Sequence, residues 1–220
     1  MLEKIKKLVQ KIYEMMPERV VKKSGAPDIS RFRTLQKPLE ETLVLLEHDK
    51  IKRICIHGTV GIGKTTILCN LNNHEQVAKK FDIVIWLKVS KEESKENLSR
   101  EDLLKDIAER LKLNIGDTSN AHEKISMVLE RKRYLLLLDD VKHYLDLSEI
   151  GIPESNNCSK IVLTTRLLND CYKMVDRAIL VERLSEVEAR WMFQDVLDEP
   201  KLIEDKKTMQ VAMKLCKDCG

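Results

Sequence analysis

The stretch CIHGTVGIGKTTILCN, residues 55–70, decides the fold of this chain. Three glycines separate two apolar segments, and the triplet Lys-Thr-Thr (64–66) follows the last glycine. The residues before the loop, 52–56, predict a buried strand, and those after it, 65–72, predict a helix. Because glycine has no Cβ, successive backbone N–H groups of such a loop can converge on one anion. The stretch therefore predicts a strand, an anion-binding turn and a helix.

The loop fits the P-loop pattern G-x-x-x-x-G-K-[ST], in the strand-to-helix context that this pattern requires. We expect Lys64 to reach the β- and γ-phosphates of a nucleotide, Thr65 to hold Mg²⁺ through its hydroxyl, and Thr66 to bond the α-phosphate. A plain glycine turn is the alternative, but such a turn does not need Lys-Thr at its end. The loop residues expected to bind the nucleotide are Gly58, Val60, Gly61, Ile62, Gly63, Lys64, Thr65 and Thr66.

The segment YLLLLDD, residues 134–140, supplies the second half of the predicted site. Its leucines predict a buried strand, and an open parallel sheet places its ligands at the carboxyl ends of the strands. We expect Asp139 to complete the Mg²⁺ shell with Thr65, and Asp140 to be the catalytic base or to orient the attacking water. The alternative is an Asp pair that only caps a turn. Together with the P-loop, this strand favours a nucleotide site.

The rest of the sequence predicts a sheet around these two segments. Three further apolar, β-branched runs predict strands, at 81–90, 160–166 and 178–184. Helical patterns with Ser or Asn start signals follow Ser99, Asn120 and Ser185. This alternation predicts an α/β fold, a three-layer sandwich with a five-stranded parallel sheet and short flanking helices.

Arg166 ends the segment KIVLTTR, which is the strand after the Asp pair. Lys64 and Asp139 are separated in sequence by a further strand, which is typical of P-loop NTPases with another strand between the loop strand and the Asp strand. In such a sheet, Arg166 would project near a γ-phosphate with Thr164 or Thr165. Charge-assisted hydrogen bonds from the guanidinium can distinguish ATP from ADP. The alternative is a surface arginine at the end of a strand.

The composition excludes several classes of protein. The net charge of the 220 residues is only +3, with both signs interspersed, so a nucleic-acid binder dominated by a basic face is not expected. The six cysteines lack disulfide-like spacing, and the pair Cys216-x-x-Cys219 has no second pair to complete a zinc site. No apolar run reaches the length of a membrane span. The sequence therefore predicts a soluble, intracellular protein.

The chain divides into four predicted parts. Residues 1–20 predict an amphipathic helix with an a/d seam. This helix would be the tail of a coiled coil, would pack on its own domain or, as a third alternative, would lie on a membrane surface. Residues 21–38 hold proline and glycine among basic residues and predict a linker. The nucleotide-binding domain is expected over 39–183, beginning with a helix. Two further helices are expected over 184–220.

Five segments resemble the NB-ARC nucleotide-binding module of plant intracellular immune receptors, the NLR resistance proteins. They are GTVGIGKTT, FDIVIWLKVS, YLLLLDDV, SKIVLTTR and LSEVEARWMF. They occur in the family's order and at similar separations, and the resemblance covers residues 35–220. FDIVIWLKVS resembles the version found in receptors with an N-terminal coiled coil. The resemblance implies a STAND/AAA-like P-loop NTPase whose residues from 184 onward open the first ARC helical subdomain.

The resemblance also implies a function. NB-ARC modules are cytoplasmic ADP/ATP switches with Mg²⁺, in which exchange of ADP for ATP permits oligomerisation and defence signalling. It implies slow hydrolysis at most, contacts with other domains and protomers, and no nucleic-acid or membrane binding by this part of the chain. The ending CKDCG resembles the start of the family's Cys-Gly-Leu-Pro-Leu motif, so we expect the chain to stop within that motif.

The sequence departs from the family pattern at three places. Val60 stands where the loop commonly has glycine, and Lys142 stands where the family usually has tryptophan. The Val-Gly-Arg that touches adenine upstream of the loop corresponds to Thr34-Leu35-Gln36. The adenine contacts on that side are thus not predicted.

Two other functions remain open from the sequence. The first is an active AAA+-like ATPase acting on nucleic acid or protein complexes, which would carry a strong basic face. The second is a nucleotide-free interaction module with a vestigial loop. Bound nucleotide and multiple-turnover kinetics distinguish these functions from a switch.

Overall fold

The computed structural model describes residues 25–90, 97–115, 120–153, 158–197 and 214. The predicted N-terminal helix at 1–20 and the last predicted helix of the chain lie outside these residues, as do Cys216 and Cys219. The strands are β1 (Arg53–His57), β2 (Ile83–Lys88), β3 (Tyr134–Val141), β4 (Lys160–Thr165) and β5 (Arg177–Leu180). The helices are α2 (Arg33–Glu47), α3 (Lys64–Asn73), α4 (Glu75–Lys80), α5 (Arg100–Arg110), α6 (Ala121–Leu129), α7 (Leu168–Cys171), the 3-10 helix η2 (Tyr172–Met174) and α8 (Glu186–Leu197).

The five strands form one parallel sheet in the order β2-β3-β4-β1-β5. Strand β4 therefore lies between β1, which leads into the glycine loop, and β3, which carries the Asp pair. This arrangement confirms the predicted α/β fold and the strand predicted between the two halves of the site. Because all strands run the same way, their carboxyl ends meet at one edge of the sheet.

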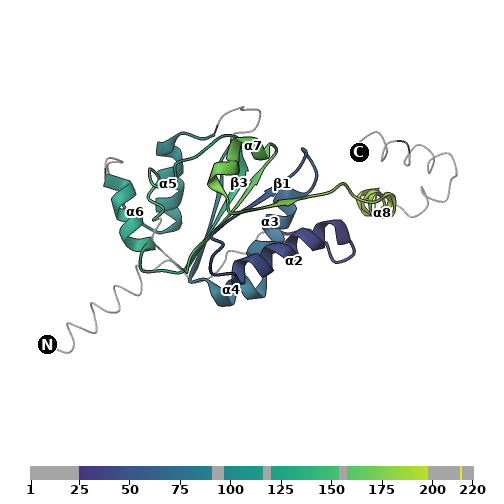
Figure 1. Ribbon diagram of the computed structural model, residues 1–220, viewed down its shortest axis with the longest axis horizontal. Coiled ribbons are helices and arrows are strands. Elements are labelled where there is room, and N and C mark those ends of the chain that lie inside the picture. The colour runs from purple at the N-terminus through teal and green to yellow at the C-terminus, as the bar shows by residue number, and fades with distance from the viewer. Residues whose placement is uncertain (1–24, 91–96, 116–119, 154–157, 198–213, 215–220) are drawn as a thin grey trace.

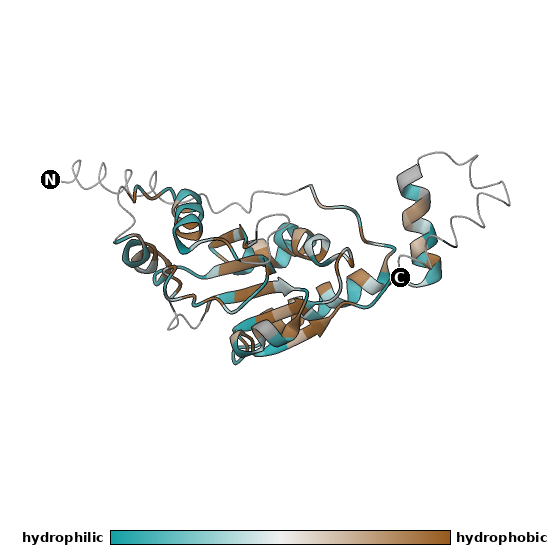
Figure 2. Cartoon of the chain, turned by 90° about the horizontal axis from the view of Figure 1, so that it is seen from above, coloured by the Kyte–Doolittle hydropathy of each residue, from teal (hydrophilic) through white to brown (hydrophobic). Residues whose placement is uncertain are grey.

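Helices cover both faces of the sheet (Figure 1), and the side chains of β3 show how. Leu135 and Leu137 belong to the hydrophobic core under α2, α3 and α4. Leu136 and Leu138 belong to the core under α5 and α6. A strand alternates its side chains between faces, so four consecutive leucines supply both cores. Figure 2 shows the hydrophobic strands enclosed between helices that turn polar residues outward.

Helix α2 corrects the predicted boundary between linker and domain. It begins at Arg33, within the stretch 21–38 predicted as a linker, and continues through Pro38. Leu35 is only 2% exposed and Phe32 only 4%, so both belong to the core rather than to a connection. Burial of these side chains stabilises the helix by more than the proline destabilises it. Sequence composition shows the proline but not the burial. The short helix α4 and the pair α7–η2 were not predicted either.

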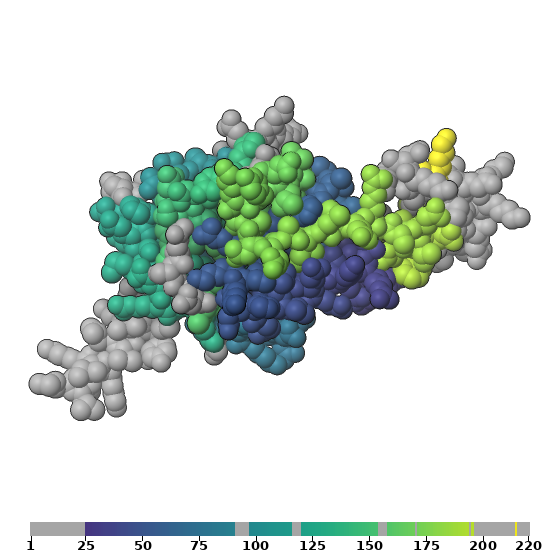
Figure 3. All heavy atoms as spheres, in the orientation of Figure 1, coloured from purple at the N-terminus to yellow at the C-terminus, as the bar shows by residue number. Residues whose placement is uncertain are grey.

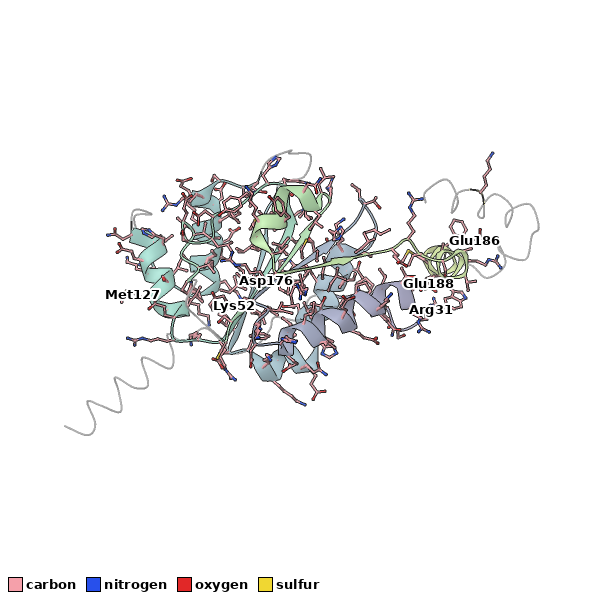
Figure 4. The ribbon with its side chains drawn as sticks, in the orientation of Figure 1. Arg31, Lys52, Met127, Asp176, Glu186 and Glu188 are labelled. Carbon is pink, nitrogen blue, oxygen red and sulfur yellow. The ribbon has the colours of Figure 1, made fainter. Side chains whose placement is uncertain are left out.

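Two charged side chains, Asp176 and Lys160, bind the backbone at the start of β1 and just after the end of α2. The carboxylate Oδ2 of Asp176 accepts hydrogen bonds from the backbone N–H groups of Lys52 (2.8 Å) and Arg53 (2.9 Å), where β1 begins. Figure 4 shows Asp176 and Lys52 close together at this end of the sheet. The buried Lys160 Nζ donates to the carbonyl oxygens of His48 (2.7 Å) and Ile51 (2.5 Å) just after α2. Charged side chains thus provide hydrogen-bond partners for backbone groups just after a helix and at the start of a strand.

Helix α8 is attached to the start of α2 through one carboxylate. Glu188 is 5% exposed and accepts hydrogen bonds from Thr34 N (2.8 Å), Thr34 Oγ1 (2.6 Å), Ser185 N (2.9 Å) and Ser185 Oγ (2.7 Å). Ser185 and Glu188 form a capping box at the helix start predicted at Ser185, because Glu188 N also donates to Ser185 Oγ. Arg31 and Asp195 add an ion pair between the same two segments. Figure 3 shows α8 against the residues at the start of α2, and Figure 4 labels Arg31 and Glu188 there.

The hydrogen bonds to Glu188 also set its protonation. Burial raises the pKa of this carboxyl, but the bonds from Thr34 and Ser185 outweigh burial and lower the pKa from 4.5 to about 2. A group whose pKa falls on folding contributes stability above its unfolded pKa and loses it as the pH drops toward the folded value. The contribution of Glu188 is therefore complete above pH 4.5 and is lost as the pH falls toward about 2.

We expect Glu188→Gln to weaken the docking of α8 by about 2 kcal/mol at pH 7, because an amide cannot accept all four bonds. Trp86→Phe leaves Trp191, on the docked side of α8, as the single tryptophan reporter. Its emission during urea titration gives the free energy of undocking. The difference in the free energy of undocking between the parent protein and Glu188→Gln should shrink as the pH is lowered from 4.5 toward 2.

The exposed Glu182 supplies the matched control, since Glu182→Gln removes the same charge outside this contact. Equal undocking midpoints for the parent protein and Glu188→Gln at pH 7 would contradict the role given to Glu188.

Candidate functional site

The glycine loop leaves β1 at Gly58 and enters α3 at Gly63. Gly61 (φ +74°) and Gly63 (φ +98°) lie in the left-handed region, which side chains disfavour. A Cβ on Gly63 would stand 2.8 Å from Leu35 Cδ2, so glycine is also needed for α2 to approach. A Cβ on Gly61 would meet no atom within 4 Å, so the loop is open on that side. The loop is therefore uncovered at Gly61, two residues before the N-cap of α3 at Gly63.

Lys64 is folded beneath this loop. It is 8% exposed, and its Nζ donates to the carbonyl oxygens of Gly58 (2.8 Å) and Thr59 (2.6 Å). Burial lowers the pKa of the Lys64 ammonium, and the neighbouring Asp140 and Asp139 oppose this effect. The ammonium is thus held where the loop closes, beside the first N–H groups of a helix. That combination suits a bound polyanion.

A β-bulge places the Asp pair at the carboxyl end of β3. The register with β4 shifts between Leu138 and Val141, so that Asp139 and Asp140 together stand opposite the single residue Thr164. Thr164 is fully buried and uses its hydroxyl twice, accepting from Asp140 N (2.8 Å) and donating to Asp139 Oδ1 (2.7 Å). Asp140 adopts φ +60° at this turn. The bulge directs neighbouring carboxylates to different partners.

Asp139 faces the glycine loop. Both of its carboxylate oxygens lie 3.0 Å from Thr65 Oγ1, and the carboxylate is almost fully buried. A carboxylate beside a threonine hydroxyl, with the loop open in front, is the hard oxygen donor set that Mg²⁺ uses next to a phosphate. Thr65 and Asp139 therefore fit the predicted metal. The described residues contain no cluster of three or more His, Cys, Asp or Glu side chains that could hold a metal by themselves.

The carboxylate of Asp140 is bound by three side-chain donors. It accepts from Ser90 Oγ (2.7 Å), Lys142 Nζ (2.7 Å), and Arg166 Nε and Nη2 (3.1 and 3.3 Å). Burial raises the pKa of Asp140, but the bonds from Lys142 and Ser90 and the charge of Arg166 outweigh it, so the pKa is lowered. The predicted base is thus an ionised carboxylate that accepts hydrogen bonds from three side chains, mostly at Oδ2.

The structure brings most of the predicted site residues to one edge of the sheet. Lys64, Thr65, Asp139, Asp140 and Arg166 all lie where β1, β3 and β4 end. Two more loop residues, Ile62 and Thr66, are half-buried beside them, whereas the Val60 side chain is 67% exposed at the loop tip. Contact of Val60 with a nucleotide would therefore fall to its backbone N–H.

Sequence reasoning missed two members of the cluster. Ser90 and Lys142 were not assigned to the site, although Ser90 ends the apolar segment 81–90 and Lys142 follows the Asp pair. Of the two threonines expected beside Arg166, Thr164 and Thr165, the first uses its hydroxyl at the bulge. A serine at the end of a predicted strand and a lysine two residues after an aspartate were the available signals.

Within the described part of the chain, every helix is too short or too polar to cross a membrane.

Known proteins match both the sequence and the fold. The model of the NB-ARC domain family matches residues 32–202. The probable disease resistance protein At5g63020 of Arabidopsis thaliana is 37% identical over 188 residues, which are 82% of this chain and 21% of that protein. The disease resistance protein UNI of Arabidopsis thaliana is 33% identical over 191 residues, again 82% of this chain and 21% of that protein. The chain thus spans about a fifth of the length of the curated relatives it matches.

Among solved structures, the ORC1 protein of Aeropyrum pernix in complex with DNA has a TM-score of 0.54 and 15% identity. The alignment covers 84% of this chain and 56% of that chain. At this identity the likeness shows the fold alone, an α/β fold with helices on a parallel sheet. The P-loop geometry, the sheet order and the family match imply a nucleotide-binding module, and the chain belongs to the NB-ARC domain family.

Proposed function

We propose that this chain is the ADP/ATP-binding switch of a cytoplasmic plant immune receptor. The observation that carries the proposal is the meeting of Lys64, the Thr65–Asp139 pair and Arg166 at one edge of the sheet. These groups supply an ammonium, a magnesium donor set and a guanidinium in front of the N-terminus of α3. The disease resistance relatives support the receptor context.

In this proposal each group has one task. The loop N–H groups from Gly61 to Thr66 and the Lys64 ammonium bind the phosphates, for which Lys64 exchanges its loop carbonyl partners for phosphate oxygens. Thr65 and Asp139 hold Mg²⁺, which neutralises phosphate charge when bound. Arg166 senses the terminal phosphate. The proposal thus keeps the nucleotide-binding residues that were expected from the sequence.

Slow hydrolysis follows from the state of Asp140. A carboxylate that orients or deprotonates a water must offer it a free oxygen lone pair. The carboxylate of Asp140 already accepts hydrogen bonds from Ser90, Lys142 and Arg166, which lower its pKa and make it a weak base. We therefore propose that nucleotide occupancy, rather than turnover, carries the signal, and that other domains of the receptor and other protomers read it.

The proposal is tested by mass spectrometry of the nucleotide that co-purifies with the protein, followed by titration with ADP and Mg²⁺. Bound ADP, or uptake of ADP with micromolar affinity or better, is expected. Folded protein that neither carries nor takes up adenine nucleotide would indicate an interaction module with a vestigial loop. Steady turnover of about 1 s⁻¹ or faster would indicate an active ATPase instead.

We expect Lys64→Ala to weaken ADP binding by roughly a hundredfold, because one charge-assisted contact to phosphate contributes about 1.5–3 kcal/mol. Asp140→Ala should weaken ADP binding far less and should mainly change single-turnover hydrolysis of ATP. Fluorescent-nucleotide titration and quenched-flow measurements on both variants check this. Equal loss of binding in the two variants would refute the separate roles of Lys64 and Asp140.

Arg166→Gln should erode the preference for ATP over ADP while leaving ADP affinity within about twofold, since the guanidinium is assigned to the terminal phosphate. The measurement is the ratio of the two dissociation constants, with a non-hydrolysable ATP analogue in place of ATP. If the ratio does not change, Arg166 is only a surface residue at the end of β4.

A further inference from the structure

Lys142 is a largely buried cation at the site that the proposed function leaves unused. Its Nζ donates to Asp140 Oδ2 at 2.7 Å, and its side chain is 13% exposed. Its partner is the same carboxylate that binds Arg166, rather than a group of the glycine loop. Two cations therefore share one carboxylate at the edge of the sheet.

The two cations are not held equally. Lys142 makes a short bond in a nearly dry position, whereas Arg166 makes two longer bonds (3.1 and 3.3 Å) from a side chain that is 45% exposed. Solvent weakens ion pairs between exposed groups, and a dry pair is screened less. Of the two cationic partners of Asp140, Arg166 is thus the one that leaves more readily.

The backbone around Lys142 keeps it in place. Lys142 N donates to Asn97 Oδ1 (2.9 Å), and Asn97 Nδ2 donates to the carbonyl oxygen of His143 (3.0 Å). Asn97 thus brackets the chain on both sides of the Lys142 carbonyl group. Because these bonds do not involve Arg166, Lys142 can remain on Asp140 when the guanidinium moves.

The carboxylate needs a cation at all times. The Asp140 side chain is only 21% exposed, and a partly buried charge without a partner is costly. If Arg166 were its only cation, transfer of the guanidinium to a phosphate would leave Asp140 uncompensated. With Lys142 and Ser90 still bound, Asp140 keeps one positive partner and one hydroxyl donor.

We propose that Lys142 is a positioning residue that raises the preference for nucleoside triphosphate over diphosphate. It serves as the standing counter-ion of Asp140 and so frees Arg166 for the terminal phosphate. This inference rests on the proposed nucleotide-binding function and adds the residue that sets how easily the triphosphate is recognised.

The test compares Lys142→Met, which keeps the length of the side chain without its charge, with Lys142→Arg, which keeps the charge. Both are made in the 220-residue chain. Affinities for ADP and for a non-hydrolysable ATP analogue, each with Mg²⁺, are measured by titration calorimetry. Lys142→Met should weaken binding of the triphosphate by about five- to tenfold and change ADP affinity less than about twofold. Lys142→Arg should restore most of the loss.

A double-mutant cycle separates this role from simple attraction between Lys142 and the phosphates. In the Arg166→Gln background, Lys142→Met should change triphosphate affinity less than about twofold, because no guanidinium is left to release. An equal loss with and without Arg166 overturns the inference in favour of direct attraction. An equal loss of ADP and triphosphate binding, with a lowered thermal unfolding midpoint, overturns it in favour of a structural role.

Nucleotide binding by the parent protein separates a failure of the proposed function from a failure of the inference about Lys142. A parent chain that binds neither nucleotide overturns the proposed function and this inference with it. A parent chain that binds both nucleotides, together with a Lys142→Met variant of unchanged triphosphate affinity, overturns the inference alone.

Discussion

The hydroxyl of Thr164 is the contact on which the rest of the site depends. One buried oxygen accepts from the backbone of Asp140 and donates to the carboxylate of Asp139, and so it stabilises a bulge of two residues against one. An unbulged strand would turn these neighbours to opposite faces of the sheet. With the bulge, Asp139 reaches Thr65 and Asp140 reaches Arg166 at the same edge. Two adjacent carboxylates thereby acquire different partners.

A second constraint links the loop to elements outside the sheet. Gly63 has no Cβ, which lets Leu35 of α2 lie against the start of α3. The neighbouring Thr34 binds Glu188 of α8 through both its backbone and its hydroxyl. The first turn of α2 thus contacts the glycine loop through Leu35 and α8 through Thr34. A change at the loop has a direct physical route to α8.

The cations at the edge of the sheet differ in how deeply they are buried and in how short their hydrogen bonds are. Lys64 and Lys142 are largely buried and held by short bonds, whereas Arg166 is half exposed and its bonds are longer. Because solvent screens the exposed pair most, the guanidinium is the group most easily moved. In a switch, the mobile charge is the one that can report which nucleotide is bound.

Sequence alone determined the fold class, the loop and the Asp strand, because these depend on local patterns: glycines that permit φ above zero, apolar runs that must be buried, and a lysine and threonine at fixed spacing. It also indicated that a strand separates the two halves of the site, which the sheet order confirms. Tertiary structure alone decided the rest. The helix through Pro38 forms because Leu35 and Phe32 are buried by residues distant in sequence. The partners of Asp140 come from the end of β2, the end of β4 and the turn after β3, and only the packing of those strands brings Ser90, Lys142 and Arg166 onto one carboxylate.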